Sequence, residues 1–191
     1  MPKFGPAGNS ESFSKMGYKN SLDVPDYIVK MGLDCYEYQC GRGVNIGEEK
    51  ARLLGGKAAK AGITLSLHAP YYISMSSTEE EKRDNSVNYI LASARAVNAM
   101  GGDRIVVHTG SCGKISRSDA LDLALDTMRK AIAALDGEGL SNIHICPETM
   151  GKVNQLGTLE EVLELCLLDE RLIPCIDFGH LNARDMGLLK S

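Results

Sequence analysis

The feature that most constrains the fold is a regular alternation of short β-rich runs with longer segments of helical periodicity. The runs number six, at 3–5, 34–39, 63–68, 104–108, 142–146 and 172–176. Strands that alternate with helices along a chain are typical of α/β proteins with a parallel sheet. The sequence therefore predicts six βα units, of which the last is incomplete.

The segments between these runs carry the signals that start a helix. Thr78 with Glu81, and Thr158 with Glu161, have the spacing of a capping box. Pro25 suits the first turn of a helix, because its missing N–H would have no partner there. We expect helices over 23–32, 48–61, 78–100, 118–135 and 158–168.

Two parallel architectures fit this order of elements, an open doubly wound sheet and a (β/α)8 barrel. The segment GRGVNIG at 41–47 has the wrong glycine spacing for a dinucleotide-binding turn, which favours the barrel. A complete barrel has about 250 residues, whereas this chain has 191. We expect one TIM-barrel domain over 1–191, truncated to about six βα units as a fragment of a longer protein would be.

Composition excludes some classes of protein. The net charge of −4 argues against a surface built wholly for nucleic acid, although it permits a locally basic groove or bound cations. No apolar stretch approaches the roughly 20 residues that span a bilayer, and the first residues do not read as a signal peptide. The six cysteines form no CxxC pair. We expect a cytoplasmic protein with no membrane partner, and the sequence leaves the oligomeric state open.

Metal-competent side chains stand at the ends of four consecutive predicted strands. They are His68, His108, Glu148 and Asp177, with His180 three residues beyond Asp177. Each could be an ordinary hydrogen-bonded or capping residue when taken alone. In a parallel barrel, however, the carboxyl ends of all strands converge on the rim where active sites lie. The joint pattern therefore predicts a metal site.

The ligand types indicate which metals could bind. Imidazole nitrogen mixed with carboxylate oxygen suits zinc, manganese or iron(II). Glu148 has two oxygens that can reach different ions, and we assign it a catalytic role for this reason. Paired ions about 3.5–4 Å apart are the arrangement that hydrolyses phosphodiesters.

Four motifs, SLHAPYYIS, VVHTGS, PETMGKVNQLGT and CIDFGHLNA, together resemble the endonuclease IV family (AP endonuclease family 2) of the xylose isomerase-like TIM-barrel superfamily. The resemblance implies a trinuclear zinc enzyme that cleaves the DNA backbone 5′ to abasic sites in base excision repair. It implies that His68 and His108 hold the first zinc and that Glu148 bridges it to the second. Asp177 would bind the second ion, and His180 would begin the third site.

The resemblance also implies contacts with DNA that contains abasic sites. Tyr71 matches a tyrosine of the DNA-binding rim, and Arg42 matches an arginine that the family inserts into the DNA stack. The chain departs from the family in FGPAGNSESF, in Glu37 near the rim and in Phe178-Gly179. The ligands of strands seven and eight would lie beyond the sixth unit.

Two alternatives therefore stay open. The first is a sugar isomerase or epimerase of the same superfamily that uses one divalent metal, for which Mn²⁺ would serve as well as Zn²⁺. The second is an inactive partial fold that binds at most one zinc ion tightly.

Overall fold

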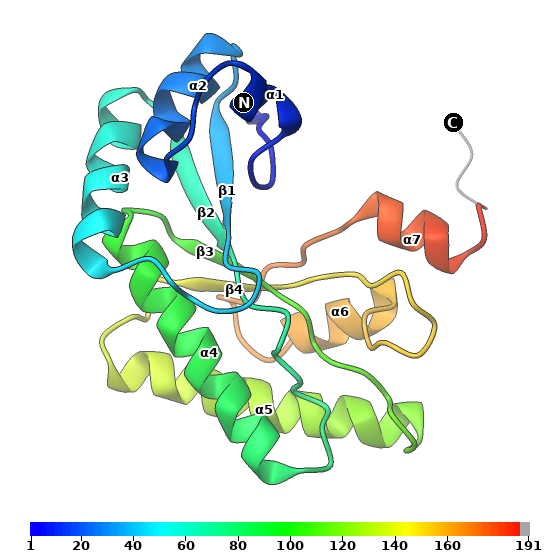
Figure 1. Cartoon of the computed structure of the whole chain (residues 1–191). Helices are drawn as coiled ribbons and strands as arrows, with labels where there is room; N and C mark the ends of the chain where they lie inside the picture. Colours follow the sequence, from blue (N-terminus) through cyan, green and yellow to red (C-terminus); the bar gives the residue numbers. More distant parts are fainter. Residues whose placement is uncertain (188–191) are drawn as a thin grey trace.

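A parallel four-stranded sheet forms the centre of the computed structural model, which describes residues 1–187 (Figure 1). The strands are β1 (Cys35–Gln39), β2 (Thr64–His68), β3 (Arg104–Val107) and β4 (His144–Pro147). They lie in the order β1-β2-β3-β4, so that each strand pairs with its neighbour in the sequence. These bounds agree within two residues with the four central runs that the sequence predicts.

The two outer predicted strands are wrong as regular strands: residues 3–5 form no bridge, and residues 172–176 form only isolated bridges. At one edge Ala7 bridges to Glu37 of β1, and Gly5 lies so close that an added Cβ would be 1.8 Å from the Cys35 carbonyl oxygen. At the other edge, Leu172 bridges in parallel to Ile145 of β4, and Cys175 bridges in parallel to Glu148 just after β4. Proline at 6 and 174 removes an N–H from each of these segments, which shortens the ladder.

Five of the helices agree with the predicted segments, and three further helical elements were not predicted. The agreeing helices are α2 (Val24–Lys30), α3 (Glu48–Lys60), α4 (Glu80–Ala99), α5 (Arg117–Gly137) and α6 (Leu159–Cys166). The others are α1 (Glu11–Lys15), the 3-10 turn η1 (Ser21–Asp23) and α7 (Phe178–Arg184).

The two predicted capping boxes have different outcomes. The box of Thr158 and Glu161 at the start of α6 is confirmed. The box of Thr78 and Glu81 is wrong, because α4 begins two residues later, at Glu80. The N–H of Glu79 instead bonds to the hydroxyl of Ser77 at 3.2 Å.

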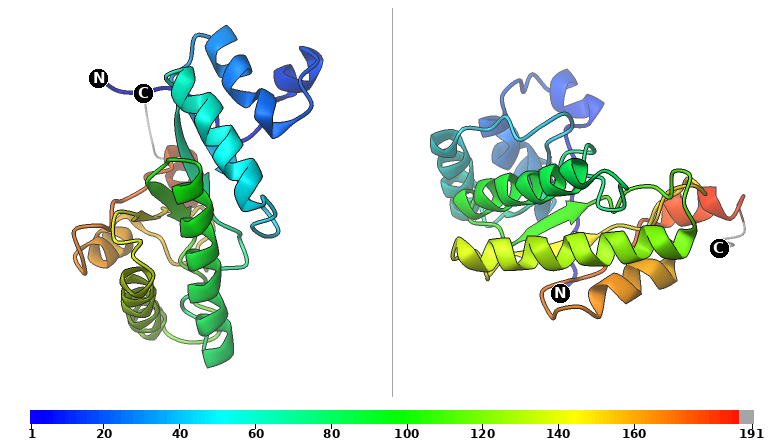
Figure 2. Two further views of the ribbon diagram at one scale, coloured as in Figure 1. Left: turned by 90° about the vertical axis from the view of Figure 1, so that its left-hand side faces the viewer. Right: turned by 90° about the horizontal axis from the view of Figure 1, so that it is seen from below.

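The core lies on one face of the sheet, beneath the long helices. Leu67, Ile105 and Ile145 of neighbouring strands are at most 1% exposed and join one apolar cluster with the inward side chains of α3, α4 and α5. Figure 2 shows α4 and α5 side by side against the sheet. Along β2, buried leucines alternate with the more exposed Ser66 and His68. The opposite face of the sheet is therefore left available for a polar site.

Packing between α3 and α4 depends on one glycine. An added Cβ at Gly55 would lie 2.2 Å from the carbonyl oxygen of Met100, the residue that caps α4. The next residue, Gly56, has no atom within 4 Å of such a Cβ.

Among residues 1–187, no helix is both long and apolar enough to cross a membrane.

Candidate metal centre

A pocket of about 560 Å³ lies at the carboxyl ends of the strands. All five predicted metal ligands line it, together with Glu37, Gln39 and Tyr71. The strand register explains this convergence: His68 pairs with Val106 of β3, and Val107 pairs with Pro147 of β4. The residues that end β2 and directly follow β3 and β4 therefore meet at one edge of the sheet.

The first donor group consists of His68, His108 and Glu148. The Nε2 atom of His68 lies 3.3 Å from Oε2 of Glu148, and that of His108 lies 3.0 Å from the same oxygen. The two imidazole planes are nearly perpendicular, at 89°. One donor atom from each residue lies within 4.8 Å of the other two, which is close enough for all three to reach one ion.

The ring of His68 is oriented by a main-chain contact. Its Nδ1 atom lies 2.9 Å from the carbonyl oxygen of Ala69, to which it can donate a hydrogen. That bond leaves Nε2, the atom that faces Glu148, able to donate a proton to the carboxylate or, with an ion bound, to present its lone pair to the ion. Metal-binding histidines commonly use their second nitrogen in this way.

The second donor group consists of Glu148, Asp177 and His180. The second oxygen of Glu148, Oε1, lies 3.7 Å from Nδ1 of His180, which is also 3.7 Å from Oδ2 of Asp177. Asp177 is the N-cap of α7, where its Oδ1 accepts from the N–H of His180 at 2.7 Å. One carboxylate oxygen of Asp177 therefore caps the helix, and the other faces the donor group.

Glu148 belongs to both groups through different oxygens. Glu148 is only 6% exposed. Burial would raise the pKa of this carboxyl, but hydrogen bonds from His108 and His68 outweigh burial and lower the pKa to about 2. The result is an ionised carboxylate in a mostly dry setting, surrounded by imidazole nitrogens. This donor set fits a divalent cation of the zinc or manganese type.

Glu37 and Gln39 also line the pocket. The sequence predicted only Glu37 near the rim. Both side chains lie on the open face of the sheet, since Glu37 pairs in register with Ser66 and Gln39 with His68. Glu37 accepts a hydrogen bond from Gln39 at 3.0 Å. Burial raises the pKa of Glu37, while the nearby His68 opposes that rise. Strand alternation was the signal that could have identified Gln39 beforehand.

The two residues expected to contact DNA meet at the rim of the pocket. Nε of Arg42 donates to the hydroxyl of Tyr71 at 3.3 Å. Tyr71 is 51% exposed, and its ring centroid lies 5.3 Å from that of Tyr72. Arg42 follows β1 and Tyr71 follows β2, so the two residues meet because their strands are neighbours.

The family described as Xylose isomerase-like TIM barrel matches residues 25–190 of the chain. The chain belongs to this family. The resemblance seen in the four motifs and the predicted α/β barrel class, present here as a partial barrel, are thereby confirmed. The sequence comparisons extend the likeness to individual proteins.

The protein MJ0133 of Methanocaldococcus jannaschii, named as uncharacterized, is 34% identical over 171 residues, which cover 90% of this chain and 61% of that protein. A protein of Malacoplasma penetrans named "Probable endonuclease 4" is 30% identical over 149 residues, or 75% of this chain and 50% of the relative. The chain thus spans between half and two thirds of the length of these relatives.

A solved structure has the same fold at low sequence identity. The 3-keto-D-glucoside 4-epimerase YcjR of E. coli superposes with a TM-score of 0.73 at 18% identity, over 94% of this chain and 70% of the epimerase. This likeness establishes the fold and leaves the activity to be argued from the site.

Proposed function

We propose that this chain provides the metal centre of a zinc-dependent phosphodiesterase that acts on the DNA backbone 5′ to abasic sites, in the manner of endonuclease IV. The observation that carries this proposal is the position of Glu148, whose two oxygens face two separate donor groups. A carboxylate shared by two ions is suited to hydrolysis of phosphodiesters. The relative named "Probable endonuclease 4" supports the same activity.

The residues have distinct tasks in this proposal. Bound ions would lower the pKa of a water molecule and neutralise charge on the phosphate. Glu148 is the bridging carboxylate on which both donor groups depend. His68 and His108 complete one group, and Asp177 and His180 complete the other.

Tyr71 and Arg42 would contact DNA at the rim. An exposed aromatic ring offers a surface on which a base can stack, and a guanidinium beside it can pair with a phosphate oxygen. Their mutual hydrogen bond would hold both side chains at the mouth of the pocket.

The test is incision of a duplex that contains a stable abasic analogue, by protein loaded with zinc and analysed for metal content. We expect cleavage 5′ to the analogue, no cleavage of the intact duplex, and loss of cleavage in Glu148→Gln. Two zinc ions per chain without any incision would refute the proposal. A single ion without incision would instead support the partial, inactive fold.

A second candidate function, a divalent-metal sugar isomerase or epimerase, is favoured by Glu37. This carboxyl lines the same pocket as the donor groups, and it suits hydroxyl recognition or proton transfer better than it suits a phosphate backbone. One ion would suffice to polarise the sugar carbonyl.

The substitution Glu37→Gln separates the two candidates. A phosphodiesterase should bind DNA equally well or better when this negative charge is removed, because repulsion of the phosphates falls. An isomerase or epimerase should lose most of its turnover, measured with a panel of ketoses and Mn²⁺. Ketose turnover by the unaltered protein in the absence of DNA binding would favour the second candidate.

A further inference from the structure

Helix α7 carries part of the second donor group but has little apolar packing. None of its residues is buried, and Phe178 in its first turn is 69% exposed. In Figure 1 the helix lies away from the layer of α3, α4 and α5 that covers the sheet. Polar contacts must therefore determine where His180 is held.

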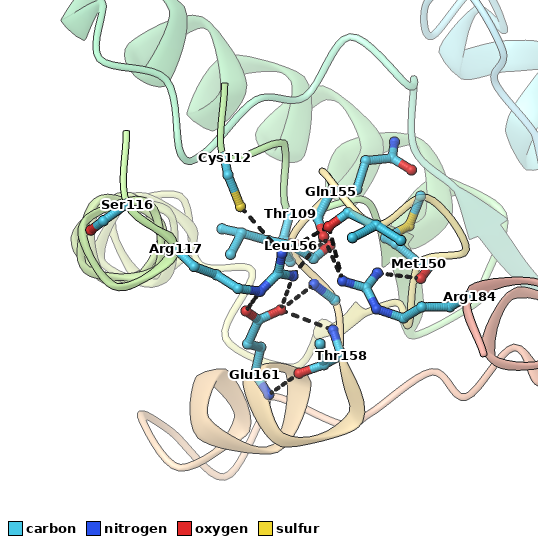
Figure 3. A network of polar contacts seen from close by, with 12 residues as sticks. Thr109, Cys112, Ser116, Arg117, Met150, Gln155, Leu156, Thr158, Glu161 and Arg184 are labelled. Atoms are coloured by element: carbon cyan, nitrogen blue, oxygen red, sulfur yellow. Dashed lines mark hydrogen bonds and ion pairs between the residues drawn. The ribbon is translucent and has the colours of Figure 1, made fainter. Parts of the chain in front are cut away.

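Two side chains of α7 bind the carbonyl groups of the loop that follows Glu148. The Nδ1 atom of His180 lies 2.9 Å from the carbonyl oxygen of Thr149. That bond needs a proton on Nδ1, the nitrogen that also faces Glu148 and Asp177, so an ion bound by this nitrogen would replace the bond and leave Arg184 to hold the helix. Arg184, four residues later and thus on the same face of the helix, donates to four further carbonyls (Figure 3). Their oxygens belong to Met150 at 2.8 Å, Lys152 at 3.0 Å, Val153 at 3.2 Å and Gln155 at 3.3 Å.

The loop is held from its other side by Arg117. This guanidinium donates to the carbonyls of Val153 at 2.8 Å and Gln155 at 2.7 Å, which are two of the acceptors that Arg184 uses. Glu161 pairs with Arg117 at 2.5 Å and accepts from the main chain of the loop as well. Arg184 therefore attaches α7 to a segment that is already anchored to α5 and α6 (Figure 3).

A glycine sets the distance between the loop and the helix. An added Cβ at Gly151 would lie 3.3 Å from the carbonyl oxygen of His180 and 3.4 Å from its Cα. A side chain there would push the helix outward at the residue that faces Glu148. The loop thus contacts α7 at two places, at His180 through Gly151 and at Arg184 through its carbonyl acceptors.

We propose that Arg184 is a positioning residue for the second donor group. It contacts no donor atom; instead it fixes α7 on the loop after β4, and so sets His180 and Asp177 at the correct distance from Glu148. The affinity for a second ion therefore depends on Arg184, whereas the affinity of the His68, His108 and Glu148 group does not. This inference rests on the two-ion centre of the proposed function.

The test is a titration of chelator-treated protein with Co²⁺, followed by visible absorption and by calorimetry. We compare Arg184→Gln, Arg184→Lys and Gly151→Val with a matched control, Arg171→Gln. Arg171 forms a similar fork, to Asp136 and Asp169, at the opposite end of the sheet from the pocket. All variants are first checked for folding by circular dichroism.

We expect Arg184→Gln and Gly151→Val to weaken the second Co²⁺ by about 10- to 100-fold, the effect usual for outer-sphere partners of metal ligands. The affinity for the first ion should be unchanged in all variants. The second-ion affinity of Arg184→Lys should lie between those of Arg184→Gln and the unaltered protein, and Arg171→Gln should bind both ions normally. Unaltered second-ion affinity in folded Arg184→Gln would overturn the proposal. Equal loss in Arg171→Gln would also overturn it, since the effect would then follow general stability.

A metal-free measurement separates this inference from the proposed function. The chain has four histidines, so the imidazole resonances can be assigned from single variants. The His180 resonance should move in Arg184→Gln and Gly151→Val and stay in place in Arg171→Gln. If the unaltered protein binds only one ion, the two-ion function fails, and a His180 resonance that does not move in Arg184→Gln would refute the positioning role.

Discussion

The Nε2 atom of His108 lies 3.0 Å from Oε2 of Glu148, the oxygen that His68 also approaches, to 3.3 Å. The other oxygen of the same carboxylate faces His180 at 3.7 Å. One side chain is thus the meeting point of three imidazoles that come from separate parts of the chain. Its removal should affect every donor group at once.

Glu148→Gln should therefore abolish tight binding of both ions. The amide keeps the shape of the side chain but lacks the charge, and we expect affinity to fall by more than the roughly 100-fold seen when an outer-sphere partner is lost. Metal content after dialysis measures this. The control is Glu37→Gln in the same pocket, which belongs to neither donor group and should keep its metal. Equal zinc content in Glu148→Gln and the unaltered protein would contradict the assignment.

Asp169 should stabilise the fold in a pH-dependent way. Hydrogen bonds from the side chain and the main chain of Arg171 lower the pKa of Asp169 from 3.8 to about 2. Because the folded pKa is depressed, the stabilisation is complete above pH 3.8 and is lost as the pH falls through about 2. Asp169→Asn should cost about 1–2 kcal/mol at pH 7, and less at pH 3.

Urea unfolding at both pH values measures the difference between Asp169→Asn and the unaltered protein. The control is Asp126→Asn, since the ion pair of Asp126 with Lys130 is solvent-exposed and 3.6 Å long. Exposed pairs contribute about 0–1 kcal/mol. A cost of Asp169→Asn that is the same at pH 7 and pH 3 would show that its charge is not the cause.

Tyr71→Ala should weaken binding of abasic duplex without loss of metal. Stacking of one base on an aromatic ring contributes about 1–3 kcal/mol, which corresponds to roughly 5- to 150-fold in affinity. Tyr71→Phe keeps the ring and its stacking surface but loses the hydroxyl that accepts from Arg42, so its affinity should fall by less, by about the 1 kcal/mol of one hydrogen bond. Fluorescence anisotropy at one fixed salt concentration measures both variants. DNA affinity that is unchanged in Tyr71→Ala would remove this residue from the proposed interface.

Gly55→Ala and Gly56→Ala should have opposite effects, although the two residues are adjacent in α3. The new Cβ at Gly55 would meet the Met100 main chain at 2.2 Å, and rigid backbone cannot move away cheaply. We expect a loss of about 3 kcal/mol or more. The Cβ at Gly56 meets nothing within 4 Å, so alanine should stabilise the helix by about 0.5–1 kcal/mol. Denaturant unfolding distinguishes the two outcomes, and equal stability of both variants would contradict this account of the packing.

The convergence of the five donors was predictable because it follows from a rule of topology. Parallel strands present their carboxyl ends at one edge, so residues that end the strands at His68 or follow them at His108 and Glu148 must meet. The four central strands and five helices followed from periodicity for similar reasons. The start of α4 did not, since the N-cap is Glu79, which makes no side-chain cap hydrogen bond, and not Thr78.

The attachment of α7 was not predictable from the sequence. The acceptors of Arg184 and Arg117 are main-chain carbonyls, which every residue carries and which therefore leave no pattern of residue types. The prediction of the two outer strands was also wrong, and here too the cause lies in the main chain. Their apolar composition suits a strand, but a proline and the close approach of Gly5 to Cys35 limit the regular pairing.

The order of the strands means that ions bound at Glu148 would also affect the stability of the sheet. Each of the four strands pairs only with strands next to it in the sequence, so strand pairing does not join the early part of the sheet directly to the late part. Donors on β2, after β3, after β4 and on α7 all converge on Glu148. Ions held there would cross-link these units without a covalent bond. Bound metal should then oppose local unfolding of the segment before α7, which bridges to β4 only at isolated points. Amide hydrogen exchange in that segment should therefore be slower when the metal centre is occupied.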